Sequence, residues 1–280
     1  MKKIFILGCS RSGTSVVQKR VVETTKLYSL PETAFFSIPN DSKKSRRENV
    51  LRLINYSRVF GENRKASDII LGIELLGVPV NDFINTGQNE FLIFEKILNL
   101  SARLNSKHGW VEKTPLHFLR IDEILTNYND AFVIFVVRNG LDVSASIRDR
   151  ANKYEEFSHQ KDFRVYTKLW NKSIGLAKQF SSHSRVIIFD FDSFVKNPNE
   201  YFRPVMDEIN SLKVSNEEDL VNIEIATRNE LWKSGLNKPI TPQKSRVSDV
   251  FTNEEIKEIE QELDFNSYNE LLSNMKNSFI

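Results

Sequence analysis

Continuous apolar runs along the chain alternate with stretches whose apolar residues recur at helical spacing. Ile4 to Leu7 forms a short apolar run, and Ala131 to Val137 forms a longer one that is apolar at every position. Strands that are apolar on both faces belong in the interior of a covered parallel sheet. Two further strands are predicted, one over Trp110 to Lys113 and one over the apolar run Val186 to Phe189.

Helical spacing follows most of these runs, and residues 35–105 are the least clear part of the pattern. The predicted helices cover Thr14 to Thr25, Phe91 to Leu104, Asp142 to Arg150, Asn199 to Ile209, and a stretch through Leu263 that opens with the capping box Thr252 to Glu255. Strands alternating with helices predict an open parallel α/β sheet flanked by helices, in one domain over residues 1–280. A basic stretch at Lys43 to Arg47 is interpreted as a solvated face, with a substrate-binding insertion as the alternative.

Composition is typical of a soluble globular protein and shows no strong charge bias. Lys plus Arg number 39 and Asp plus Glu number 37, so the net charge is +2. We therefore expect no nucleic-acid partner, and an anion site has to be a local cluster. The single cysteine, Cys9, excludes an intrachain disulfide, and a reducing, cytoplasmic location follows as the expectation. The run at Ile4 is too short for a secretory signal, and no stretch approaches the roughly 20 apolar residues of a membrane span.

A loop rich in small residues joins the first predicted strand to the first predicted helix. Its sequence is Gly8-Cys9-Ser10-Arg11-Ser12-Gly13-Thr14-Ser15. Small residues let backbone N–H groups curl around an anion, and the N-terminus of the helix adds positive potential. Gly8 and Gly13 have Walker A spacing, but Thr14 stands where the lysine of that motif belongs, which argues against nucleoside triphosphate chemistry. A tight strand–helix turn without a ligand is the alternative interpretation.

A second candidate anion site follows the strand that ends at Val137. Arg138 lies at the carboxyl end of that strand, where open α/β sheets bind ligands, and Ser146 lies eight residues further on, in the predicted helix. An arginine fork and a hydroxyl would hold a phosphate well. Asp142 is predicted to cap the helix. Together with the first loop, Arg138 predicts a ligand with two separate anionic groups.

These motifs resemble the PAPS-dependent sulfotransferases, especially the branch with tyrosylprotein and bacterial sulfotransferases. Family members carry a Gly-x-Pro-Arg-Ser-Gly-Thr-Thr-like loop and an Arg-(Asn/Asp)-Pro-x-Asp-(x)3-Ser segment. This chain has Ser10 and Gly140 where the family prolines are usual, which removes no ligating group. Further matches occur at Pro31-Glu32, at Trp110 to His117 and at Phe191 to Pro198, so the likeness extends from residue 4 to about residue 198.

The resemblance implies a P-loop-like fold and a donor site for 3′-phosphoadenylyl sulfate (PAPS). The first loop would hold the 5′-phosphosulfate through Arg11, Ser12, Gly13, Thr14 and Ser15. The 3′-phosphate would meet Arg138 and Ser146, with Arg150 as a further contact. A closing basic loop is assigned to Lys244 and Arg246, although the family's glycine and tryptophan are missing there.

The same resemblance implies transfer of a sulfuryl group from PAPS to an acceptor hydroxyl or amine, leaving adenosine 3′,5′-bisphosphate. Glu32 is the expected general base, with His117 as second choice, and Lys113 would stabilise the transferred group. No metal is expected in this chemistry, and no His/Cys/Asp/Glu cluster has metal-ligand spacing. The acceptor (carbohydrate, peptide, lipid or small molecule) and the oligomeric state stay open. The alternatives are a P-loop nucleotide kinase or NTPase and a non-catalytic nucleotide-binding domain.

Overall fold

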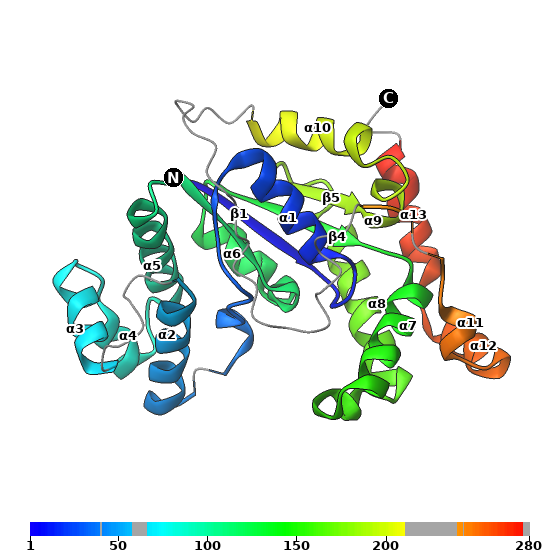
Figure 1. Ribbon diagram of the computed structural model, residues 1–280, viewed down its shortest axis with the longest axis horizontal. Helices are drawn as coiled ribbons and strands as arrows, with labels where there is room; N and C mark the ends of the chain where they lie inside the picture. Colours follow the sequence, from blue (N-terminus) through cyan, green and yellow to red (C-terminus); the bar gives the residue numbers. More distant parts are fainter. Residues whose placement is uncertain (40, 58–65, 211–239, 243, 277–280) are drawn as a thin grey trace. The chain divides into compact units, whose positions relative to one another are not determined.

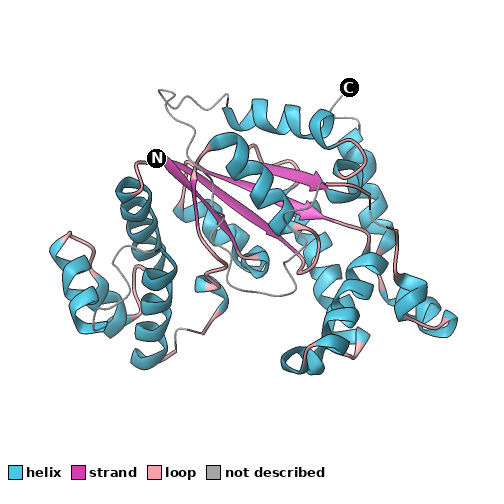
Figure 2. Cartoon of the chain, in the orientation of Figure 1, coloured by secondary structure: helices cyan, strands magenta, loops and turns pink. Residues whose placement is uncertain are grey.

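The computed structural model of the protein describes residues 1–39, 41–57, 66–210, 240–242 and 244–276. Within these residues, five strands form one sheet in the order β2-β3-β1-β4-β5. Figure 2 draws strands in magenta. Their bounds are β1 Lys2–Gly8, β2 Tyr28–Ser29, β3 Gly109–Lys113, β4 Ala131–Val137 and β5 Val186–Asp190. The strands of the pairs β2–β3 and β4–β5 run parallel. The predicted open parallel sheet flanked by helices is thus confirmed.

The two apolar runs that were clearest in the sequence form strands whose residues are almost all buried. In β1 only Lys2 is partly exposed, and in β4 only Phe132 is. Val133 of β4 lies opposite Val186 of β5, and the register continues to Val137 opposite Asp190. Arg138, one residue further on, therefore follows the carboxyl end of β4.

Helices and 3₁₀ turns make up the rest of the regular structure (Figures 1 and 2). The helices are α1 Thr14–Thr25, α2 Lys43–Ser57, α3 Ala66–Leu75, α4 Val80–Thr86, α5 Glu90–Leu104, α6 Ile121–Asn127, α7 Gly140–Lys153, α8 Phe163–Phe180, α9 Phe191–Phe194, α10 Pro198–Asn210, α11 Val247–Val250, α12 Asn253–Glu262 and α13 Phe265–Lys276. The 3₁₀ turns are η1 Phe35–Ser37, η2 Pro115–Arg120 and η3 Glu155–Gln160. None of the helices in the described ranges is long and apolar enough to cross a membrane.

Contacts divide the described chain into two compact units. The first unit holds residues 1–5 and 18–131, and the second holds residues 6–17, 132–210 and the described residues after 239. The prediction of a single domain stays a prediction. Residues 211–239, part of the C-terminal third that the sequence left unassigned, lie outside the described residues.

The first unit packs α2, α4 and α5 together, with α5 also against β3. An aromatic core ties these elements: Phe94 of α5 lies 6.0 Å from Trp110 of β3, ring centre to ring centre, and 5.3 Å from Phe35 of η1. The basic stretch at the start of α2 is only in part a solvated face. Lys43 is exposed, whereas the Arg46 guanidinium donates to the Ile84 carbonyl at 2.9 Å.

The second unit packs α7 against α8, and α12 and α13 against α8 as well. The capping box is confirmed, because the Thr252 hydroxyl accepts from the Glu255 amide and the Glu255 carboxylate accepts from the Thr252 amide. The predicted cap of α7 was wrong. Its N-cap is Asn139, whose Oδ1 accepts from the Leu141 amide at 2.9 Å, whereas Asp142 accepts from the Ser245 hydroxyl at 2.7 Å. An asparagine before the first helical turn fills the cap position ahead of Asp142.

Candidate functional site

The loop after β1 is forced into a tight curl by its backbone conformation. Gly8 has φ 144°, and a Cβ added there would lie 2.3 Å from the Val136 carbonyl oxygen of β4. Arg11 and Gly13 have φ values of 72° and 94°, in the region that most side chains avoid. Strained backbone of this kind is concentrated at ligand-binding loops. The two glycines therefore have structural reasons for their positions, as the sequence predicted for a tight turn.

Gly13→Ala is expected to lower the free energy of unfolding by about 2 kcal/mol or more, because a Cβ would be strained and would clash. The added atom would lie 2.2 Å from the Phe191 ring, in a backbone with φ 94°. Urea unfolding measures the loss. Gly175→Ala in α8 is the matched control, since a Cβ at that glycine meets no atom within 4 Å among the described residues. Equal stability of the two variants would contradict the packing of Phe191 on this loop.

Arginine side chains gather around the loop within the second unit. Arg11 donates from Nε to the Ser146 hydroxyl at 3.0 Å, and Arg138 donates from Nη1 to the Arg11 carbonyl at 3.3 Å. Burial lowers the pKa of Arg11 to about 10, and repulsion by the like charges of Arg150, Arg138 and Arg246 adds to that shift. Arg11 is thus repelled by three other arginines, against a smaller opposite effect of Asp149, and a bound anion would relieve this repulsion.

Ser12 adds a hydroxyl to the same loop. Its residue is 1% exposed, and Oγ has no hydrogen-bond partner among the described residues. A buried hydroxyl without a partner costs free energy, so the position fits an oxygen-rich ligand that would supply one. Thr14 is buried as well, and Ser15 is partly exposed. The predicted loop residues and the arginines therefore fit a phosphate- or sulfate-bearing donor in the chemistry of their groups.

Cys9 lies in this loop but offers it no reactive thiol. The residue is 1% exposed, and burial raises the pKa of its thiol to about 12. A thiol of this kind stays protonated at neutral pH and is a poor nucleophile. Cys9 therefore serves the packing between the end of β1 and the loop.

The segment after β5 holds Arg138 in place. Nε of Arg138 lies 3.7 Å from Oδ1 of Asp192, and the Arg138 guanidinium lies 5.1 Å from the centre of the Phe191 ring. Asp192 also accepts from the Asn139 amide at 2.7 Å. Burial raises the pKa of Asp192, while that hydrogen bond and the charge of Arg138 act the other way. The segment from Phe191 to Pro198 resembles a family segment, but the sequence analysis assigns no role to Phe191 or Asp192.

Two of the three donor-binding residues predicted in the C-terminal segment and near the end of α7 act on Arg11 by their charge, namely Arg246 and Arg150. Arg246 lies 3.2 Å from the Asp149 carboxylate, and its charge acts on Arg11. Lys244 is exposed. Arg150 donates to the Gln160 amide oxygen at 2.7 Å and lies 4.1 Å from the centre of the Phe157 ring. Arg246 thus has firmer structural support than Lys244.

A second group of predicted residues lies in the first unit, where β3 ends. Lys113 is 1% exposed, and its ammonium pairs with the Glu32 carboxylate, whose side chain is 36% exposed. Thr114 followed by Pro115 is typical of the capped start of an α-helix, and the sequence predicts a helix beginning there. The structure has the 3₁₀ turn η2 instead, and the Thr114 hydroxyl donates at 2.6 Å to the Glu112 carboxylate rather than capping the turn. A hydroxyl that already donates to a nearby charged carboxylate is held away from the turn's amides.

His117, the second choice as base, is fully buried with both ring nitrogens engaged. Nε2 accepts from the Phe36 amide at 3.1 Å, and Nδ1 lies 3.0 Å from the Glu112 carboxylate. Sequence reasoning gave Glu112 no role, although a carboxylate inside an otherwise buried strand was a signal. Its burial favours the neutral acid, but His117, Thr114 and Thr33 outweigh that effect, and the pKa of Glu112 lies below its usual value.

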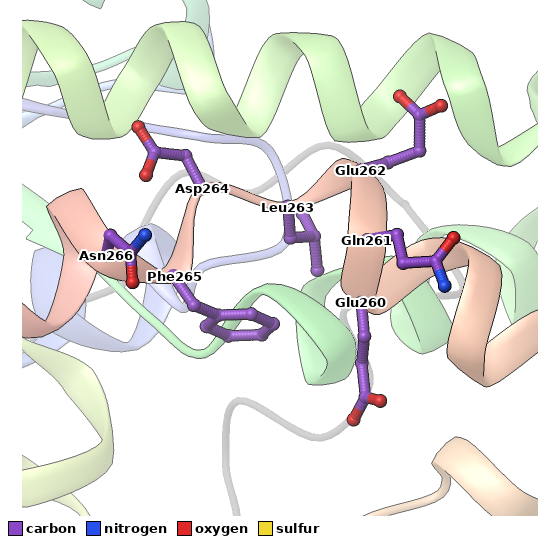
Figure 3. Close-up of a pocket in the computed structure, with 7 residues that line it drawn as sticks. All are labelled: Glu260, Gln261, Glu262, Leu263, Asp264, Phe265 and Asn266. Carbon is purple, nitrogen blue, oxygen red and sulfur yellow. The ribbon is translucent and has the colours of Figure 1, made fainter.

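A surface hollow of about 460 Å³ lies elsewhere, where α12 leads into α13 (Figure 3). The residues that line it are Glu260, Gln261, Glu262, Leu263, Asp264, Phe265 and Asn266. Three carboxylates would repel an anionic donor, and none of the predicted site residues lines this hollow. In the part of the chain that the structure describes, no group of three or more His, Cys, Asp or Glu side chains is placed to hold a metal ion.

Two solved structures with a similar fold are sulfotransferase domains. The domain from the Synechococcus PCC 7002 olefin synthase aligns with a TM-score of 0.52 and 15% identity, over 92% of this chain and 82% of that one. The domain from the curacin biosynthetic pathway gives a TM-score of 0.51 and 20% identity, over 89% and 95%. Among curated proteins, none matches this chain in sequence. A family described as the sulfotransferase family matches residues 3–210. Because this match covers most of the 280 residues, the chain belongs to the sulfotransferase family.

Proposed function

We propose that this protein is a cytoplasmic PAPS-dependent sulfotransferase that acts on an acceptor hydroxyl or amine. Four arginines and a buried hydroxyl without a partner around one loop are the observation that supports this donor most. PAPS carries a 5′-phosphosulfate and a separate 3′-phosphate, so its two anionic groups match the two predicted anion sites. Family membership supports the reaction class. The single buried cysteine agrees with a reducing compartment.

The loop and the arginines are assigned to donor binding. The phosphosulfate would be held by Arg11, Ser12, Gly13, Thr14 and Ser15. Backbone N–H groups and the N-terminus of α1 would add to the positive potential of Arg11. The 3′-phosphate would meet Arg138, Ser146 and Arg150, and the nucleotide would be closed over by Lys244 and Arg246. Guanidinium groups suit this task because their planar donors match phosphate oxygens.

The residues at the end of β3 are assigned to the chemistry. In the transfer, the acceptor oxygen or nitrogen forms a bond to sulfur while the bond from sulfur to the bridging oxygen breaks, and the electron pair stays on adenosine 3′,5′-bisphosphate. Glu32 would take the acceptor's proton. Lys113 would stabilise negative charge on the bridging oxygen and the sulfuryl group. His117 keeps both ring nitrogens on protein partners, so we assign it to holding the Glu32 segment rather than to proton transfer.

Calorimetric titration with adenosine 3′,5′-bisphosphate is the direct test of the donor assignment. We expect binding that needs the 3′-phosphate and no added metal, with 5′-AMP and ATP·Mg²⁺ binding much more weakly. Removal of charge-assisted contacts to one phosphate group should cost about 2 kcal/mol or more, so 5′-AMP should bind at least roughly 30-fold more weakly. Absence of binding, or a preference for ATP·Mg²⁺, would overturn the proposal in favour of a kinase-like site.

A further inference from the structure

Glu112 is the centre of a closed hydrogen-bond network in the first unit. Its side chain is 0% exposed. Oε1 accepts from the hydroxyls of Thr33 at 2.9 Å and Thr114 at 2.6 Å, and Oε2 accepts from Nδ1 of His117 at 3.0 Å. A fully buried carboxylate is costly unless its oxygens are satisfied, and here three donors do so.

The three side chains that donate to Glu112 each accept a hydrogen bond from a backbone amide. The Ala34 amide donates to Thr114 Oγ1 at 3.1 Å, the Phe35 amide to Thr33 Oγ1 at 3.2 Å, and the Phe36 amide to His117 Nε2 at 3.1 Å. Three consecutive amides are therefore held through one carboxylate. A backbone amide can only donate, so His117 carries its proton on Nδ1, the nitrogen that faces Glu112.

The segment held in this way contains a strained residue and adjoins Glu32. Ala34 has φ 49° and ψ 21°, a left-handed conformation that is strained for an alanine. Such a conformation persists only where surrounding contacts fix it. Thr33, which donates to Glu112, directly follows Glu32, and Lys113, the partner of Glu32, directly follows Glu112.

We infer that Glu112 is a positioning residue that fixes the segment from Thr33 to Phe36 and thereby keeps the Glu32 carboxylate on the Lys113 ammonium. Glu112 takes no part in bond making. The inference rests on the proposed function for the role of Glu32, while the anchoring itself is independent of that role.

The charge of Glu112 is required, because its amide analogue cannot satisfy the network. A glutamine that turns its oxygen to the two threonines presents its NH₂ group to the Nδ1–H of His117. His117 cannot shift that proton to Nε2 without facing the Phe36 amide with a second donor. The opposite orientation of the amide leaves two hydroxyl protons without an acceptor. Either orientation leaves a buried donor unsatisfied.

Amide hydrogen exchange, followed by NMR, tests the anchoring. In Glu112→Gln the amides of Ala34, Phe35 and Phe36 should exchange about 10- to 100-fold faster than in the wild type, as expected for one unsatisfied buried group. The Leu98 amide of α5 reports general opening of the same unit and should change less. Glu258→Gln, an exposed carboxylate of α12, is the control and should leave all four rates unchanged. Unchanged exchange at Ala34 to Phe36 in Glu112→Gln would overturn the inference.

A second variant keeps the inference testable if Glu112→Gln does not fold. Thr33→Val keeps the shape of the side chain and removes the hydroxyl that the Phe35 amide and Glu112 share. Exchange should then accelerate at Phe35 more than at Phe36, whose partner His117 is unchanged. Equal exchange at Phe35 in the variant and the wild type would overturn the anchoring.

The link to Glu32 is tested by turnover of PAPS with water as acceptor, measured as adenosine 3′,5′-bisphosphate released. Glu112→Gln should lower kcat at least about tenfold, with bisphosphate affinity within about twofold of wild type, because only the base is displaced. Glu112→Asp, which keeps the charge, should recover part of the rate. When Glu112→Gln is added to Glu32→Gln, kcat should fall little below that of the Glu32→Gln variant. If the two substitutions lower kcat by independent factors, Glu112 does not act through Glu32. A wild type that neither binds the bisphosphate nor turns over PAPS would instead refute the proposed function and leave the exchange result standing.

Discussion

Replacing Glu32 by glutamine is expected to lower turnover by about 10²- to 10⁴-fold while affinity for adenosine 3′,5′-bisphosphate stays unchanged. Glutamine keeps the shape of the side chain and can still accept a hydrogen bond from Lys113, but it cannot take the acceptor's proton. A general base contributes a factor of that size. The groups assigned to the donor phosphates are untouched by the change, so binding should persist.

Steady-state rates with PAPS, together with calorimetry on the same variant, separate the two effects. Glu258→Gln again serves as the control, since it removes an exposed carboxylate of α12. Full activity in Glu32→Gln would remove Glu32 as the base. Loss of nucleotide affinity in the same proportion as the loss of turnover would mean that Glu32 acts in binding instead.

Arg138→Ala should weaken binding of adenosine 3′,5′-bisphosphate by about 2 kcal/mol or more, roughly 30-fold. The side chain is fixed from several directions, by the Arg11 carbonyl at 3.3 Å, the Phe191 ring and the Asp192 carboxylate. Little side-chain freedom is then lost when a phosphate binds, and the full charge-assisted contact contributes. Removing Arg138 also leaves Asp192 without its cation, which adds repulsion toward an anionic ligand.

The charge and the geometry of Arg138 can be separated with Arg138→Lys. A lysine keeps the charge but lacks the planar pair of donors, so we expect it to recover only part of the affinity. Arg164→Ala removes an exposed arginine of α8 and should leave binding within about twofold, because exposed charges are screened by salt. Unchanged affinity of Arg138→Ala for adenosine 3′,5′-bisphosphate would refute the assignment of Arg138 to the 3′-phosphate.

The parts of the fold that the sequence predicted well are those in which local pattern and burial agree. Both α1 and β4 have the bounds that the pattern indicated, since β4 is apolar at every position and α1 follows directly after a loop that contains two glycines. The helices between residues 43 and 86 were not predicted, since α2 begins with seven polar residues and α4 spans only two turns. The two-residue strand β2 exists through its pairing with β3, which no local pattern reports.

The candidate site also has parts that the sequence predicts and parts that only the structure reveals. Arg11 and Ser146 could be proposed from motifs, and the structure places them 3.0 Å apart, but their roles toward a donor stay predictions. The network of Glu112 joins residues that lie 79 positions apart in the chain, and the packing of Phe191 on Gly13 joins the start of α9 to the loop after β1. Contacts of this kind depend on how strands are ordered in the sheet. The cap of α7 was missed because Asn139 and Asp142 are both good capping residues, and only the geometry selects one.

The buried thiol of Cys9 has a practical consequence for labelling. Maleimides and iodoacetamides react with thiolates, and this thiol is both enclosed and held protonated by its raised pKa of about 12. Since the chain has one cysteine, the native protein should take up almost no label under mild conditions. A cysteine introduced at an exposed position such as Ser182 would then react selectively. A fluorophore or spin probe can be attached there without first mutating the loop that bears Arg11.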